Sequence, residues 1–315
     1  MNFNEFVESV KANILNHMPI EYRDSQVEIR EIIKENEERV KNLVVKATGT
    51  NIYPAAPLEI AFENYLSDKD LERVLDELGV AIVKAYAAKD TGGLDLFDFN
   101  SVKERIICEV VGIRGNEKLI EESPHFLIDD LAILFRVQID PIRSFLIKND
   151  MAGYYNAGPD ELYEEALNNA QREEIYEIKG IGEAFSEMGF IYPGVTDFDT
   201  TKGNEDMYVL SNKTGYRGSS CIAFPEFIEE CENLLGEEFI MLPASLHEMI
   251  AIPMSKVEAN GNYSEIVRSV NEAVVAKEDR LSENVYIYNP KERMVRALTN
   301  GGNSLNLDIK RAGSY

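Results

Sequence analysis

The stretch that decides the fold is Glu238-Phe-Ile-Met-Leu-Pro-Ala-Ser-Leu-His-Glu-Met-Ile-Ala-Ile-Pro253. Two short apolar runs, 239–242 and 249–252, are each followed by a proline. Proline has no N–H to donate to a sheet, so each one marks the end of a strand. The two runs and the polar connection between them predict a β-hairpin with a long loop. His247 and Glu248 then lie where the second strand begins.

Outward from this hairpin, helical and strand patterns interleave. Apolar residues alternate strictly from Leu131 to Ile139, which predicts a half-buried strand whose residues Ile133, Phe135 and Val137 face the core. Apolar spacing of three and four residues predicts a helix at the N-terminus and a long one at 68–88, with Ser67 as its N-cap. Further strands are expected at 26–34, 39–47, 106–113, 144–148, 207–211, 220–224, 285–288 and 294–298, and further helices at 58–66, 159–172, 225–235 and 264–279. Hairpins interleaved with helices indicate an α+β fold with a mostly antiparallel sheet.

The stretch Asp90-Thr-Gly-Gly-Leu-Asp95 is the clearest linker, because its glycines and polar residues interrupt the apolar periodicity. We therefore expect an N-terminal helix-hairpin-helix lobe over 1–95 and an α+β domain over 96–298. Residues 299–315, with their paired glycines, are expected to form a flexible tail.

The composition of the chain indicates in which cellular compartment the protein is located. The chain of 315 residues is 44% hydrophobic, which is enough for a packed core. It contains no apolar run of membrane-spanning length and its N-terminus has no secretory pattern, so no membrane association is expected. Cys108, Cys221 and Cys231 are odd in number and widely spaced, which favours a reducing environment. We expect a cytoplasmic protein.

The formal net charge of −24 excludes the class of proteins that bind nucleic acid by neutralising phosphates with Lys and Arg. Acidic residues gather between Gly218 and Ser255, a span without any Lys or Arg. An acidic surface of this kind either keeps the protein soluble or binds a basic protein partner. If there is such a partner, we expect it to bind Glu229, Glu230 and Glu232.

One constellation resembles a hydrolase site. Ser219, Ser220 or Cys221 could be the nucleophile, with His247 as the base and Glu248 as the orienting carboxylate. The alternative is that Cys221 is a buried structural thiol, since apolar residues follow it, and that His247 orients its loop by hydrogen bonding. A zinc-peptidase motif is excluded because Ala251 stands where the second histidine belongs. The segment 197–203 departs from a calcium loop at its glycine position, so neither a metal nor a cofactor is expected.

Several segments together resemble a bacterial family of uncharacterised proteins designated domain of unknown function 5688 (DUF5688). The most specific is Leu242-Pro-Ala-Ser-Leu-His-Glu-Met-Ile-Ala-Ile-Pro253, and Gly218-Ser-Ser-Cys-Ile-Ala-Phe-Pro225 supports it. Weaker matches are Asn4-Glu-Phe-Val-Glu-Ser-Val10, Asn51-Ile-Tyr-Pro54, Pro124-His125 and Tyr208-Val-Leu-Ser-Asn212. The resemblance covers about residues 1–298. It implies a cytoplasmic bacterial protein, often encoded on mobile elements, and it implies no catalytic residues.

Three classes of function remain. The first is a non-enzymatic binding module whose acidic C-terminal half meets a protein partner. The second is a DNA mimic that inhibits a host nuclease, and the third is a hydrolase that uses Cys221 and His247.

Overall fold

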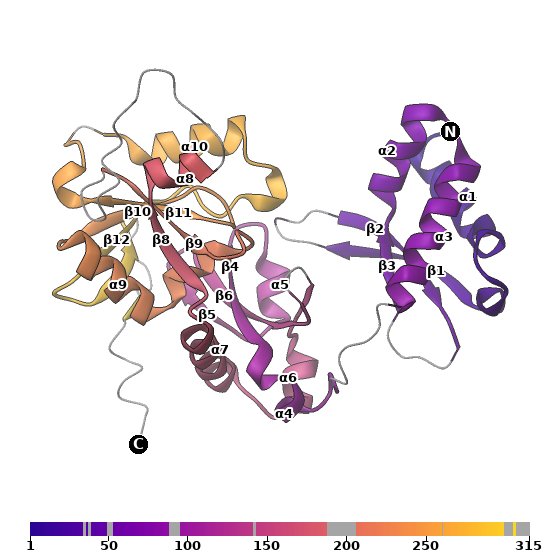
Figure 1. Ribbon diagram of the computed structural model, residues 1–315, viewed down its shortest axis with the longest axis horizontal. Coiled ribbons are helices and arrows are strands. Elements are labelled where there is room, and N and C mark those ends of the chain that lie inside the picture. Colours follow the sequence, from indigo (N-terminus) through magenta and orange to yellow (C-terminus); the bar gives the residue numbers. More distant parts are fainter. Residues whose placement is uncertain are drawn as a thin grey trace. The chain divides into compact units, whose positions relative to one another are not determined.

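The computed structural model describes residues 1–33, 36, 39–48, 53–87, 95–140, 143–187, 206–259, 261–298 and 305–306. The chain divides into two compact units, Met1–Leu94 and Asp95–Tyr315 (Figure 1). Most of the expected linker, the segment 197–203 and most of the expected tail lie outside the described residues.

Unit 1 packs helices on a small antiparallel sheet. The sheet has the order β1-β2-β3, with β1 at Gln26–Ile33, β2 at Arg39–Lys46 and β3 at Ala55–Pro57. Its helices are α1 Phe3–Asn13, α2 Leu58–Asp68 and α3 Leu71–Ala87, with short 3-10 turns η1 Ile14–His17 and η2 Ile20–Tyr22. Their apolar faces meet the sheet in one core that contains Phe6, Leu43, Leu58, Leu75 and Ile82.

The break between α2 and α3 lies two residues later than expected. Ser67 is inside α2, and the chain turns at Lys69, which takes the left-handed conformation with φ 62°. The Asp70 carboxylate accepts the Arg73 backbone N–H, so Asp70 caps the next helix in place of Ser67.

The smaller sheet of unit 2 is built around β6, Leu131–Gln138. It pairs antiparallel with β4 Ile106–Gly112, β5 His125–Ile128 and β7 Ser144–Leu146. Ile133, Phe135 and Val137 are fully buried, as predicted. The expectation of a half-buried strand is wrong, because Ala132 and Leu134 on the opposite face are also fully buried.

The larger sheet of unit 2 has the order β14-β13-β12-β10-β11-β9-β8. At its centre β10 Phe239–Pro243 pairs with β11 Met249–Pro253, and Pro243 lies opposite Met249, which confirms the predicted hairpin. The flanking strands are β8 Tyr176–Gly180, β9 Tyr208–Asn212, β12 Tyr286–Asn289, β13 Met294–Ala297 and β14 Leu305–Asn306. The last of these belongs to the segment expected to be a tail.

Helices cover both faces of this larger sheet. Figure 1 shows α10, Tyr263–Ala273, on one side and α9, Pro225–Leu235, on the other. Val267 of α10 joins Ile240 and Ile287 in an apolar cluster. The remaining helices of unit 2 are α4 Phe99–Val102, η4 Lys103–Arg105, α5 Glu117–Glu121, α6 Asn149–Tyr155, α7 Pro159–Glu173, α8 Ile181–Glu187, η5 Gly218–Ala223, η6 Met254–Lys256 and η7 Lys277–Asp279. Helix α10 ends six residues before the predicted 279.

One predicted strand is a helix. Residues 220–224 were expected to be extended, but η5 occupies Gly218–Ala223 as a buried 3-10 turn. Strand β9 already pairs with β8 on one edge and β11 on the other, so the chain that follows it finds no free edge there.

In the described part of the chain the strands form three sheets and every strand pair is antiparallel, so the fold is α+β as predicted. None of the described helices combines the length and the apolar character that a membrane crossing needs.

Candidate functional site

The Cys221 thiol lies inside the protein. Its side chain is fully buried in η5, and the sulfur is 3.8 Å from the Ser219 carbonyl oxygen. Burial raises the pKa of Cys221, and burial likewise raises the pKa of Cys231. Because the nucleophile in thiol chemistry is the thiolate, a buried thiol of raised pKa is unreactive at neutral pH.

His247 uses both ring nitrogens for contacts with neighbouring segments. Its Nδ1 accepts the Arg217 backbone N–H at 3.1 Å, and its Nε2 lies 3.3 Å from Asp279 Oδ1. The ring also packs against the Tyr216 ring, with centroids 5.5 Å apart. The Glu248 carbonyl oxygen accepts backbone N–H groups from Ala244 and Ser245 and so closes the hairpin loop.

The two segments with the best family resemblance therefore do meet, but through serine hydroxyls and backbone carbonyls. The Ser219 hydroxyl donates to the Leu246 carbonyl at 2.7 Å, and the Ser211 hydroxyl donates to the His247 carbonyl at 2.8 Å. A Cβ on Gly218 would lie 2.5 Å from the His247 carbonyl oxygen, so only glycine fits at this crossing. We call residues 216–219 with 246–247 the turn–hairpin clamp.

The three glutamates expected to bind a partner lie together on α9 but differ in their surroundings. Glu229 pairs with Arg293, and Glu232 accepts the Tyr288 hydroxyl at 2.7 Å. Burial and this hydrogen bond raise the pKa of Tyr288. Of these three residues, Glu230 is exposed to solvent, whereas Glu229 and Glu232 are partly buried.

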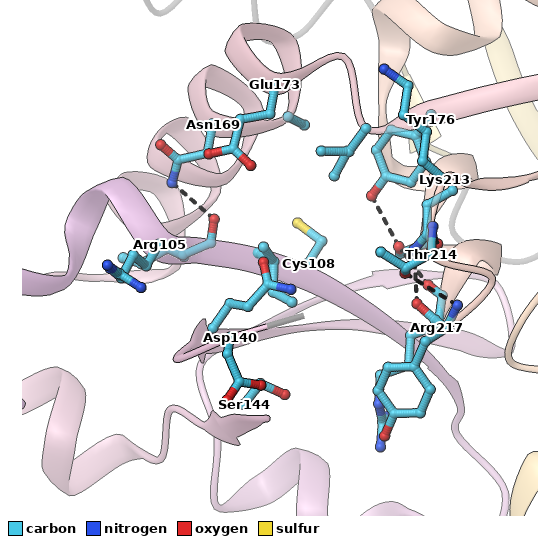
Figure 2. Close-up of a pocket in the computed structure, with 18 of the residues that line it drawn as sticks. Arg105, Cys108, Asp140, Ser144, Asn169, Glu173, Tyr176, Lys213, Thr214 and Arg217 are labelled. Carbon is cyan, nitrogen blue, oxygen red and sulfur yellow. Dashed lines mark hydrogen bonds between the residues drawn. The ribbon is translucent and has the colours of Figure 1, made fainter. Parts of the chain in front are cut away.

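A cavity of about 520 Å³ lies beside the clamp, within unit 2 (Figure 2). Figure 2 shows Cys108 of β4 between Asn169 and Glu173 of α7 on one side and Tyr176, Lys213 and Arg217 on the other. Its walls come from η4 and β4, the β6–β7 connection, the end of α7, the start of β8 and the turn after β9. Sequence reasoning did not find this site.

The cavity is lined by more basic than acidic side chains. Three acids line it, and so do five basic residues: Arg105, Arg143, Arg172, Lys213 and Arg217. The formal charge of the lining is therefore 5 − 3 = +2, whereas the whole chain carries −24.

Several of these charges are balanced locally. Arg143 pairs with Asp140, and Arg172 lies 3.3 Å from a Glu173 carboxylate oxygen. Arg105 donates to the Ile139 carbonyl at 3.0 Å. Within the described residues, neither Arg105 nor Lys213 forms a salt bridge.

A buried carboxylate holds the Arg217 side chain at the cavity wall. The Glu109 carboxylate of β4 is fully buried and contacts two guanidinium groups, those of Arg136 at 2.8 Å and of Arg217. Arg136 also donates to the Ser144 hydroxyl at 2.9 Å. A buried carboxylate shared by two arginines fixes both side chains, since moving either one would leave a buried charge less compensated.

Two polar groups complete the lining. Asn169 is 4% exposed and its amide nitrogen donates to the carbonyl oxygens of Lys103 and Ile106, at 2.8 and 2.9 Å. Its Oδ1 has no hydrogen-bond partner in the described part of the protein. The Tyr176 hydroxyl lies 2.9 Å from the Ser220 hydroxyl, and burial raises the pKa of Tyr176. The cavity thus offers cationic donors from its basic side chains.

Residues 3–290 match the Family of unknown function (DUF5688), and the chain belongs to that family. The search of curated proteins and the search of solved structures both returned no significant match.

Proposed function

We propose that this protein is a non-enzymatic binding protein that takes a small anionic molecule into the cavity of unit 2. The observation that carries the proposal is the charge contrast between the cavity lining, at +2, and the whole chain, at −24. Acidic residues outnumber basic ones 56 to 32 along the chain, so an excess of basic residues around one cavity is a local reversal of the overall composition.

The size and chemistry of the cavity agree with this class of ligand. A volume of about 520 Å³ falls within the range of small-molecule sites, which run from about 300 to 1,000 Å³. Arg105 and Lys213 supply positive charge to the lining. A small anion of this volume would be attracted to these two groups.

The non-enzymatic part of the proposal rests on Cys221 and His247. The thiol is fully buried with a raised pKa, and the imidazole contacts Arg217 and Asp279. This arrangement supports the structural alternative for both residues over the hydrolase. The three cysteines are free thiols, which supports our proposal of a reducing, cytoplasmic location.

The test is calorimetric titration of the full chain with three probes: sulfate, succinate and a nucleoside triphosphate. We expect at least one to bind with a dissociation constant in the millimolar range or tighter. Lys213→Gln and Arg105→Gln should each weaken that binding several-fold, because each removes one cationic group from the cavity. Lys291→Gln is the matched control, an exposed lysine that does not line the cavity. Failure of all three probes, or an equal loss in the control, overturns the proposal.

A second candidate is the predicted module that binds a basic protein, on the acidic span Gly218–Ser255. Glu226 and Glu230 on α9 are exposed, which favours it. The DNA-mimic hypothesis is less well supported, because a mimic needs a row of accessible carboxylates. Glu229 and Glu232 instead contact the β12–β13 hairpin. We propose that such a partner, if captured from a cell, loses affinity for Glu230→Gln; unchanged binding excludes this surface. Retention of duplex DNA at ordinary salt would contradict our proposal that the protein binds no nucleic acid.

A further inference from the structure

The hydrogen bond that the His247 ring accepts from Arg217 fixes the position of the ring proton. The Arg217 backbone N–H donates to Nδ1 at 3.1 Å, so Nδ1 carries no hydrogen. A neutral imidazole then has its hydrogen on Nε2, and Nε2 lies 3.3 Å from the Asp279 carboxylate, a suitable acceptor. The Arg217 hydrogen bond therefore selects this neutral tautomer, and the Asp279 carboxylate lies on the Nε2 side of the ring.

Arg217 depends on this contact because its backbone is in a disfavoured conformation. It has φ 57° and ψ 30°, in the left-handed region that residues with a side chain seldom adopt. This conformation directs the Arg217 N–H to His247 while its side chain reaches Glu109 and lines the cavity. The next residue, Gly218, is packed against the His247 carbonyl oxygen. The clamp thus connects the imidazole to the cavity through a single residue.

Protonation would reverse the polarity of that contact. A proton on Nδ1 turns the acceptor into a donor that faces another N–H, and the hydrogen bond is lost. In the described part of the chain the ring contacts the Asp279 carboxylate and the Tyr216 ring, and its Nδ1 binds the Arg217 backbone; Glu248 is its neighbour in sequence. The side chain of His247 is 31% exposed, so solvent protons can reach it.

We infer that His247 is a proton-dependent contact at the cavity wall: neutral His247 holds the Arg217 backbone, and protonation of His247 breaks that contact while the Glu109 carboxylate still holds the guanidinium group. The inference rests on the proposed function only for its consequence, which is that anion affinity falls as the pH falls. The positive charge of the imidazolium acts in the opposite direction, so an experiment must separate the lost hydrogen bond from the added charge.

The first test needs no ligand. Nuclear magnetic resonance of the full chain follows the Arg217 amide shift and its hydrogen exchange from pH 8 to pH 5, the range in which imidazoles commonly titrate. We expect the Arg217 amide to shift and to exchange faster in step with the titration of the His247 ring. His247→Asn keeps an acceptor without a titrating ring and should leave the amide unchanged over this range. His247→Phe removes the acceptor and should show the broken contact already at pH 8.

His125→Asn is the matched control for the ring. His125 contacts the Ser123 carbonyl at 2.8 Å and does not line the cavity, so this variant should titrate like the unmodified protein at Arg217. An Arg217 amide that stays constant while the His247 ring titrates overturns the inference.

The second test measures sulfate affinity at pH 8 and pH 5.5, since sulfate keeps its charge over that range. We expect several-fold weaker binding at the lower pH in the unmodified protein and no change in His247→Asn. Stronger binding at low pH would show that the added charge dominates, and it would overturn the inference. If sulfate binds at neither pH, the anion proposal loses this probe, while the Arg217 amide still decides the role of His247.

Discussion

Replacement of Glu109 by Gln should destabilise unit 2 by about 3–5 kcal/mol, the usual cost of breaking a buried ion pair from one side. The Glu109 carboxylate is fully buried and contacts Arg136 and Arg217, whose side chains are each 14% exposed. Glutamine has nearly the same volume, so packing changes little and the lost charge dominates. Both guanidinium groups would keep their positive charge without the carboxylate that they share.

The measurement is urea unfolding of the full chain, followed by circular dichroism because the chain has no tryptophan. With an m-value of about 2–3 kcal/mol per molar urea, the midpoint should fall by about 1–2.5 M. Hydrogen exchange of the β6 amides assigns the change to unit 2. The control is Glu122→Gln, whose carboxylate is 41% exposed and pairs with Lys148, and it should cost less than about 1 kcal/mol. A Glu109→Gln cost equally small would refute the argument that this buried carboxylate fixes the two arginines.

Other predictions follow from burial and from single contacts. Phe135→Ala should cost about 3–5 kcal/mol, because Phe135 is fully buried and packs edge-on against Phe126 and Tyr163; a loss below about 1 kcal/mol in urea unfolding would contradict this. Iodoacetamide at pH 8 should not label Cys221 in the folded protein, and rapid labelling detected by mass spectrometry would contradict its raised pKa. Burial and the Asp95 charge raise the pKa of Tyr155 to about 12. An unfolded tyrosine loses its proton near pH 10, so protonated Tyr155 stabilises the fold below about pH 10. This stabilisation is lost as the pH rises to about 12, and thermal unfolding measured as a function of pH should show the loss.

The sequence was sufficient to predict those strands and helices whose residue pattern lies within one short segment. The β10–β11 hairpin follows from two apolar runs closed by Pro243 and Pro253, and both strands occur as predicted. Strand β6 also follows from alternation, but its second face is covered as well, and a single strand pattern does not show what packs on it. On that second face Arg136 belongs to the buried ion cluster around Glu109.

The cavity could not be predicted in the same way. Its lining residues lie between Glu104 and Ser220 and come from several separate elements, so no sequence spacing connects them. Arg217 precedes the family-like segment that begins at Gly218, yet only the contacts with Glu109 and His247 show its place at the cavity wall. The error over η5 has a similar origin, because Ser220–Phe224 has strand-like composition and the occupied edges of β9 become visible only in the assembled sheet.

Salt dependence separates the two proposed functions, because the long-range and local charges of this protein have opposite signs. At a distance an anion meets the field of a chain with net charge −24, and only near the cavity does it meet a lining of +2. The Debye length shrinks from about 30 Å at 0.01 M salt to about 8 Å at 0.15 M, so added salt screens the distant repulsion more than the short-range attraction. The association rate of an anionic cavity ligand should therefore rise, or at least not fall, over this range. The rate for a basic protein on the acidic surface should fall steeply, since screening removes the attraction that steers it. Stopped-flow kinetics at the two salt concentrations show whether the association rate rises or falls with salt. If the association of the anion slows as steeply as that of a basic protein, the acidic surface does not govern the approach of the anion.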